Sequence, residues 1–223
     1  MTVDNFDLIR SHLTFKNPGD CYYVHLLRRQ ADDPMIDGKK DPSYHGNMHS
    51  RSLKDYFISS LEQFDALKTE IITLCEMFNV RAYIRLNKRN YRTMSLQLLK
   101  HITDQLMAGE TFSSPYRLVS SAAGLAKASD CEKTWVVDLD KEYLPYEQDI
   151  IEHICACEPF QKKEDMFIVP TKNGKHIICK PFNITKLQGW WNALSLDHPS
   201  LCDIHKDNPT ILYVPDGKMT VKL

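Results

Sequence analysis

The chain has 223 residues, of which 43% are hydrophobic and 26% are charged, and its formal net charge is -1. This composition is typical of a globular protein with a substantial core, and it contains no apolar run long enough to span a membrane. Because the N-terminus lacks a basic segment followed by an apolar one, we expect no export and a cytoplasmic location.

The charges are unevenly distributed along the chain. Residues 81–100 hold six basic and no acidic side chains, whereas residues 130–165 hold eleven acidic against four basic ones. A surface that binds a polyanion beside a surface that binds metal ions would produce this asymmetry. Two solvent-exposed faces that differ in charge but bind nothing would produce it as well. The seven cysteines are odd in number and irregularly spaced, which favours reduced thiols over a disulfide framework.

The first half of the chain predicts alternating strands and helices. Strands are expected at residues 21–27, 56–59 and 80–86, with a long polar loop at 28–51. Ser60 and Gln63 have the spacing of a capping box, and apolar residues recur at helical spacing as far as Phe78, so a helix should end at Asn79. A second amphipathic helix is expected at 91–107, ending at Gly109.

The second half predicts a sharper pattern. Strands are expected at residues 134–139, 166–169, 176–179 and 210–214, and helices at 146–157 and 184–194. The order β-α-β-β-α-β is that of ferredoxin-like sheets and of an RRM-like or palm domain. We therefore expect an α+β protein in which an N-terminal αβ unit, residues 1–128, packs on a C-terminal RRM-like unit, residues 129–223.

Two carboxylates end the first of these later strands. Asp138 and Asp140 follow Trp135-Val136-Val137, and side chains two residues apart share one face of a strand. Two divalent cations about 3.5–4 Å apart relieve the repulsion between such carboxylates and clamp the oxygens of a phosphoryl displacement. The same pattern also occurs as an ordinary solvated strand end.

A polar hairpin delivers a histidine to the start of a later strand. Its turn contains Lys172, Asn173, Gly174 and Lys175, and His176 opens the apolar strand that follows. Because the first and third strands of this order are adjacent, we expect His176 beside the carboxylates and both lysines within reach of phosphate oxygens. The alternative is a surface hairpin whose lysines only confer solubility.

A third carboxylate lies near the end of the chain. Asp203 stands on a short apolar segment just before the last predicted strand, where it could join the acidic pair. Asp207, before Asn-Pro, and Asp216, before Gly, compete for this role, but both have the sequence context of turn residues. We therefore choose Asp203.

These motifs resemble the archaeo-eukaryotic primase superfamily, which includes primase-polymerases of phages and plasmids. The pattern is an acidic pair after an apolar strand, then small-x-His, then an apolar residue and Asp, here Val137-Asp138-Leu139-Asp140, Gly174-Lys175-His176 and Cys202-Asp203. Cys202 is a less usual neighbour for the third acid. The resemblance covers about residues 134–215 and implies that the three acids bind metals and that the histidine contacts the phosphates of the incoming nucleotide.

The resemblance implies an enzyme, a metal-dependent nucleotidyltransferase that adds nucleotides to a nucleic-acid 3′-hydroxyl. Its cofactor would be Mg²⁺ or Mn²⁺ at a two-metal site, and its partners nucleoside triphosphates, single-stranded DNA or a primer-template and a helicase on a separate chain. Lys172, Asn173, Gly174 and Lys175 would hold the triphosphate with His176. Candidates to guide the nucleic acid are the basic residues Arg85, Lys88, Arg89 and Arg92.

Two other classes of function remain open at this stage. One is a non-catalytic nucleic-acid-binding or scaffold protein of a replication system, and the other is a metal-dependent nuclease that uses the same carboxylates. Three further motifs have plainer interpretations: a thiol-rich helix at 153–157 in place of a zinc site, a solvated or DNA-contacting loop at 45–49, and core packing for Trp190-Trp191.

Overall fold

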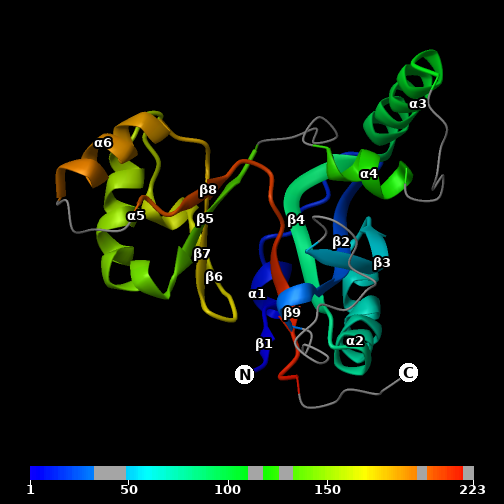
Figure 1. The fold of residues 1–223 in the computed structure, drawn as a ribbon, viewed down its shortest axis with the longest axis horizontal. Coiled ribbons are helices and arrows are strands. Elements are labelled where there is room, and N and C mark those ends of the chain that lie inside the picture. Colours follow the sequence, from blue (N-terminus) through cyan, green and yellow to red (C-terminus); the bar gives the residue numbers. More distant parts are fainter. Residues whose placement is uncertain (33–48, 110–117, 126–132, 195–199, 218–223) are drawn as a thin grey trace. The chain divides into compact units, whose positions relative to one another are not determined.

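The computed structural model describes residues 1–32, 49–109, 118–125, 133–194 and 200–217 (Figure 1). The chain divides into two compact units, residues 1–132 with 211–223 and residues 133–210. Within the described residues, the protein is mixed α and β with two antiparallel sheets, as expected. No helix in this part of the chain is both long enough and apolar enough to cross a bilayer.

The first unit contains a five-stranded sheet with the strand order β1-β9-β4-β2-β3. Its strands are β1 (Val3–Asp4), β2 (Asp20–Arg29), β3 (Ser50–Ile58), β4 (Arg81–Asn90) and β9 (Thr210–Val214). Its helices are α1 (Phe6–Arg10), α2 (Leu61–Phe78), α3 (Tyr91–Met107) and α4 (Leu118–Gly124), with a short 3₁₀ turn at Gln30–Asp32. Most of the predicted loop at 28–51 lies outside the described residues.

The long helix α2 has the ends that its sequence predicts. The hydroxyl oxygen of Ser60 accepts a hydrogen bond from the Gln63 backbone N–H at 3.1 Å, and the Gln63 side chain accepts one from the Ser59 N–H at 2.7 Å. Asn79 ends the helix in the left-handed conformation, with φ of 48°. Through its buried face α2 packs on β2, β3 and β4, which forms the core on that face of the sheet.

The second unit contains a four-stranded sheet with the strand order β6-β7-β5-β8. Its elements are β5 (Trp135–Asp140), α5 (Glu147–Ala156), β6 (Phe167–Pro170), β7 (Gly174–Cys179), α6 (Ile184–Leu194) and β8 (Asp203–His205), with 3₁₀ turns at Lys141–Tyr146 and Lys163–Asp165. Strands β5 and β7 are adjacent and antiparallel, which confirms the expected pairing of the first and third strands.

The predicted last strand of this unit was wrong. Residues 210–214 do form a strand, but β9 pairs with β1 and β4 in the sheet of the first unit. The fourth strand of the second sheet is β8, which has three residues and pairs with β5. The predicted boundary of 128/129 is close to the observed one, whereas residues 211–223 belong to the first unit and not to the second.

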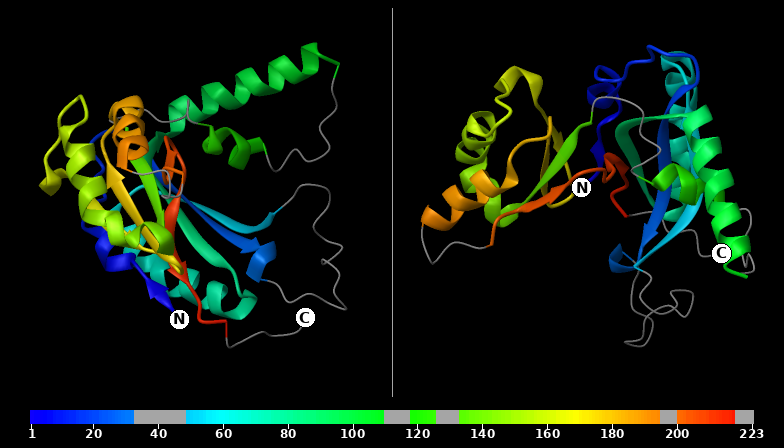
Figure 2. Two further views of the ribbon diagram at one scale, coloured as in Figure 1. Left: turned by 60° about the vertical axis from the view of Figure 1, so that its left-hand side comes forward. Right: turned by 90° about the horizontal axis from the view of Figure 1, so that it is seen from above.

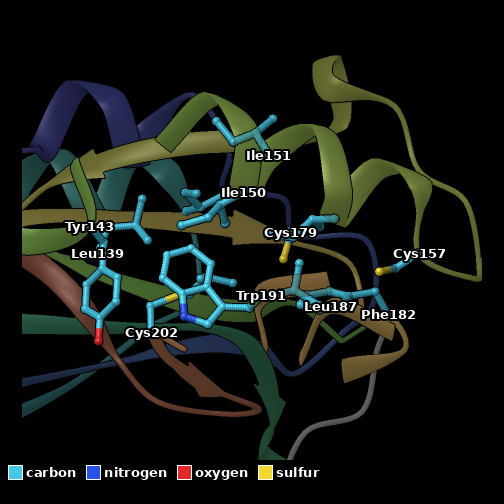
Figure 3. Close-up of a cluster of buried hydrophobic side chains, with 13 residues drawn as sticks. Leu139, Tyr143, Ile150, Ile151, Cys157, Cys179, Phe182, Leu187, Trp191 and Cys202 are labelled. Atoms are coloured by element: carbon cyan, nitrogen blue, oxygen red, sulfur yellow. The ribbon is translucent and has the colours of Figure 1, made fainter. Parts of the chain in front are cut away.

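Helices α5 and α6 cover one face of the second sheet (Figure 2). Alternate residues of β5 and β7 form a buried cluster with these helices, to which Ile150, Leu187 and Trp191 contribute (Figure 3). The strand members of the cluster are Val137, Leu139, Ile177 and Cys179. Because side chains alternate along a strand, the residues between them lie on the opposite face. In the alternating sequence Val-Asp-Leu-Asp of β5, the apolar residues therefore face the core and the aspartates lie on the opposite, polar face.

The described cysteines are all free thiols. This agrees with the absence of a disulfide framework inferred from the sequence, although Cys131 lies outside the described residues. Burial raises the pKa of Cys179, and the same holds for Cys202, whose pKa is raised to about 12. Both thiols therefore behave as small core residues and stay protonated at neutral pH.

Candidate functional site

Three side chains from distant parts of the sequence form a row across the second sheet. Asp138 lies in the central strand β5, and its register partners are His176 in β7 and Asp203 in β8. Residues directly opposite each other on antiparallel strands project to the same face. Asp140, two residues along β5, shares that face. We call Asp138, Asp140, Asp203 and His176 the acidic face.

The register also decides between the competing third acids. Asp203 is paired with Asp138 across β5 and β8. Asp207 follows β8 in a bend, and Asp216 belongs to the first unit and so is not part of this sheet. Asp203 therefore lies next to the acidic pair, where the sequence analysis expected it, and Asp207 and Asp216 do not.

Both ring nitrogens of His176 face polar groups. Its Nε2 lies 3.4 Å from Oδ1 of Asp138, and its Nδ1 lies 2.8 Å from Oγ1 of Thr210. The His176 side chain is 12% exposed, against 34% for Asp138, so the ring is the better enclosed of the two. The imidazole is thus fixed beside the carboxylate, while the carboxylate keeps access to solvent.

The carboxylates create a local excess of negative charge. Asp140 lies at an exposed strand end, yet partial loss of hydration and then the charges of Asp138 and Glu142 raise its pKa. The charge of Asp203 raises the pKa of Asp140 further, while His176 lowers it. A carboxylate whose pKa is raised by its neighbours gains most from a nearby cation, which would relieve the repulsion.

Gly174 allows β7 to approach the acidic strand closely. It is the register partner of Asp140, and a Cβ atom at this position would lie 1.9 Å from the Leu139 carbonyl oxygen and 3.0 Å from the Asp140 Cα. No side chain fits there without displacing backbone. The small residue two positions before His176 is therefore needed for contact between the strand that carries the histidine and the strand that carries the acids.

The hairpin before β7 has the predicted turn. The Thr171 N–H donates to the Gly174 carbonyl oxygen at 2.9 Å, and the Gly174 N–H donates to the Thr171 hydroxyl at 3.0 Å. Lys172 and Asn173 are exposed at its tip, next to the strand that bears His176. These two side chains are therefore open to solvent.

Lys175 does not belong to the acidic face. It alternates with Gly174 and His176 along β7 and so lies on the side of the helices, where its Nζ is 2.5 Å from Oε2 of Glu147 at the start of α5. The ion pair is partly exposed and contributes little to stability. The sequence-based expectation that Lys175 lies near the carboxylates and meets a triphosphate there is therefore not met.

The basic residues singled out in the first unit differ sharply in exposure. Lys88 and Arg89 are buried, at 7% and 0% exposure. The Lys88 Nζ lies 3.2 Å from Oδ2 of Asp20, and the Arg89 Nε donates to the Ala123 carbonyl oxygen at 2.8 Å. Both therefore have structural partners and do not form the expected nucleic-acid surface. Arg85 is half-buried, and Arg92 is exposed at the start of α3.

The other motifs have structural explanations. Trp191 is buried in the core, and Trp190 stacks on His153 with ring centroids 3.7 Å apart. Cys157 is buried. The thiol-rich segment of α5 is thus part of helix packing, as predicted. Residues 45–48 of the histidine-containing loop lie outside the described residues.

The acidic face fits Mg²⁺ or Mn²⁺ by its donor chemistry. Three carboxylates supply the hard oxygen ligands that these ions prefer, and loss of hydration together with the neighbouring acids raises the pKa of Asp140. Across the described ranges, no three His, Cys, Asp or Glu side chains converge into a ready-made metal cluster.

Comparisons with known proteins do not identify a relative. No model of a protein family matches the chain, and neither curated protein sequences nor solved structures give a match. What the chain does must therefore be argued from the site itself.

Sequence reasoning missed Thr210 and Glu147 as neighbours of the site residues. Thr210 stood out only as the start of a strand, and no local pattern connects it with His176, which lies 34 residues earlier. The sequence did contain a pattern that predicts on which face of the sheet Lys175 lies. Since His176 was assigned to the acidic face, strict alternation already placed Lys175 on the other face.

Proposed function

We propose that the protein is a metal-dependent nucleotidyltransferase of the primase-polymerase kind. The observation that carries the proposal is the register of β8, β5 and β7, which unites Asp203, Asp138 and His176 on one face of a sheet. A random set of surface acids has no reason to meet a histidine in this way. The same residues carry the resemblance to the archaeo-eukaryotic primase superfamily.

The architecture of the second unit supports this proposal. Its chain order is β-α-β-β-α-β, its helices lie on one face, and its central strands β5 and β7 carry the acidic pair and the histidine. An RRM-like palm places its catalytic residues in the same way, on the sheet face away from the helices. We accordingly assign the second unit as the palm of the enzyme.

The proposed reaction joins a nucleoside triphosphate to a nucleic acid, either single-stranded DNA or a primer-template. A 3′-hydroxyl oxygen attacks the α-phosphorus and forms a new phosphodiester bond. The bond from the α-phosphorus to the oxygen that bridges to the β-phosphorus breaks, pyrophosphate leaves, and the hydroxyl proton passes to water. Asp138, Asp140 and Asp203 would hold Mg²⁺ or Mn²⁺, which lowers the pKa of the hydroxyl and neutralises charge that develops on the phosphates.

The protein's own residues would position the triphosphate. His176 presents Nε2 to the acidic face, where it can donate a hydrogen bond to a phosphate oxygen once an ion occupies Asp138. Lys172 lies at the exposed hairpin tip and can supply a point charge to the outer phosphates. Lys175 is held by Glu147 and takes no part in this step.

The test is template-directed incorporation of a labelled nucleotide with Mn²⁺. Replacing Asp138 with alanine removes the central ligand and should lower the rate on the order of 100-fold or more, as losses of electrostatic stabilisation in active sites do. Asp149→Ala serves as the matched control, because Asp149 is an exposed acid of α5 in the same unit, and its rate should stay within about twofold of wild type.

Other outcomes of this assay would reject the proposal. Equal, metal-independent incorporation by wild type and Asp138→Ala would show that the acidic face is not the site. Degradation of DNA without added triphosphates, abolished by Asp138→Ala, would identify a nuclease. Salt-sensitive DNA binding with no incorporation, unchanged in the variant, would identify a binding protein.

A further inference from the structure

Thr210 makes a buried contact with the histidine of the acidic face. The Thr210 side chain has no exposed surface, and its Oγ1 lies 2.8 Å from Nδ1 of His176. It is the first residue of β9 and the last residue of the second unit. The hydroxyl is thus anchored on the side of the ring opposite to Asp138.

The two contacts of the ring define where its proton lies. Nε2 lies 3.4 Å from Oδ1 of Asp138, and a carboxylate this close attracts an N–H group and repels a nitrogen lone pair. The proton of the neutral ring therefore belongs on Nε2. Nδ1 is then an acceptor, and the Thr210 hydroxyl is its donor.

We propose that Thr210 is a positioning residue, which fixes the His176 ring and keeps its proton on Nε2. The N–H group of the histidine then points to the acidic face, where a phosphate oxygen of a nucleoside triphosphate can accept it. This inference rests on the proposed function, because it assigns the triphosphate as the group that His176 meets. Thr210 itself touches neither the ligand nor a metal ion.

The proposed role depends on the Thr210 hydroxyl alone. Two substitutions can therefore distinguish the effect of its hydrogen bond from the effect of side-chain packing. Valine has nearly the volume of threonine and removes only the donor, whereas serine keeps the hydroxyl and loses a methyl group. If Thr210 acts through its hydrogen bond, Thr210→Val must disturb His176 and Thr210→Ser must restore it. If Thr210 only fills space, valine should behave as wild type and serine should show the greater damage.

The first readout is the ring nitrogen spectrum of His176, measured by NMR without metal at fixed neutral pH and assigned by its loss in His176→Asn. Wild type and Thr210→Ser should show a protonated Nε2 and an unprotonated Nδ1. Thr210→Val should show a mixture of the two neutral tautomers. An unchanged spectrum in Thr210→Val overturns the proposal, whether or not the protein is an enzyme.

The second readout is calorimetric binding of dATP in the presence of Mn²⁺, with Mn²⁺ alone as reference. Loss of one hydrogen bond should weaken dATP binding by Thr210→Val about 3- to 10-fold, with Mn²⁺ binding unchanged and Thr210→Ser close to wild type. Equal losses for dATP and Mn²⁺, or a serine variant as poor as valine, would overturn the assignment. Failure of wild type to bind dATP would instead remove the proposed function, while the NMR result still decides the role of Thr210.

Discussion

Replacing Gly174 with alanine is expected to destabilise the second unit by about 3 kcal/mol or more, at the upper end of overpacking costs. The added Cβ would lie 1.9 Å from the carbonyl oxygen of Leu139, and that atom belongs to the backbone of the central strand β5. A flexible side chain could move away, but this strand is hydrogen-bonded to neighbours on both sides. The variant must therefore separate β7 from β5 or fail to fold.

Gly189 offers the matched control for this substitution. It lies in the interior of α6, and a Cβ there would meet nothing within 4 Å. Gly189→Ala should stabilise the protein by about 0.5–1 kcal/mol, because alanine restricts the unfolded chain and suits a helix. Urea unfolding followed by circular dichroism measures both effects. A Gly174→Ala protein as stable as wild type would show that β5 and β7 do not pair in this register.

Lys88→Met is expected to cost about 3–5 kcal/mol, the usual cost of breaking a buried ion pair. The substitution leaves the Asp20 carboxylate, which is 5% exposed, without the ammonium group 3.2 Å away. Burial raises the pKa of Asp20, but hydrogen bonding from the Asn17 N–H and the Lys88 charge outweigh it, so the pKa is lowered. Asp20 therefore stabilises the fold above its unfolded pKa, and this contribution is lost as the pH falls.

The pH dependence of this loss follows from the sign of the pKa change. In Lys88→Met the Asp20 carboxylate loses its cation, its pKa rises, and it protonates at a higher pH than in wild type. The stability difference between the two proteins should therefore be greatest near neutral pH and shrink towards pH 4. Asp20→Asn combined with Lys88→Met should recover part of the loss, since neither member of the pair then leaves an unpaired buried charge.

Arg92 provides the comparison for a surface position. Its side chain is exposed, and Arg92→Gln should change the free energy of unfolding by no more than about 0.5 kcal/mol. Urea unfolding at several pH values compares the variants. If Lys88→Met were as stable as wild type and lost only DNA affinity, then Lys88 would be a nucleic-acid contact and the structural role given to it here would be wrong.

Sequence patterns predicted the structure correctly where the interactions involve residues close together in the chain. The capping residues Ser60 and Gln63 located the start of α2, and Asn79 located its end, because these interactions span only a few residues. The alternation in Val137-Asp138-Leu139-Asp140 separated core from polar face for the same reason. The acidic face could be anticipated because chain order and alternation together fix which side chains meet.

The errors arise where the partner lies far away in the sequence. β9 has five buried residues and no pattern that tells one sheet from another, so its place in the first unit could not be deduced. β8 has three residues, too few for any periodicity to be visible. Lys88 looked like a surface cation because its partner, Asp20, stands 68 residues earlier.

The central claim is that the acidic face binds metal ions and a nucleotide together. A crystal structure with Mn²⁺ and a nucleoside triphosphate tests it directly, because the anomalous signal of manganese locates the ions independently of any assumed chemistry. We predict manganese between Asp138, Asp140 and Asp203, with a phosphate oxygen accepting a hydrogen bond from His176. Manganese and triphosphate bound elsewhere, with these carboxylates empty at saturating Mn²⁺, would contradict the assignment of this face as the active site.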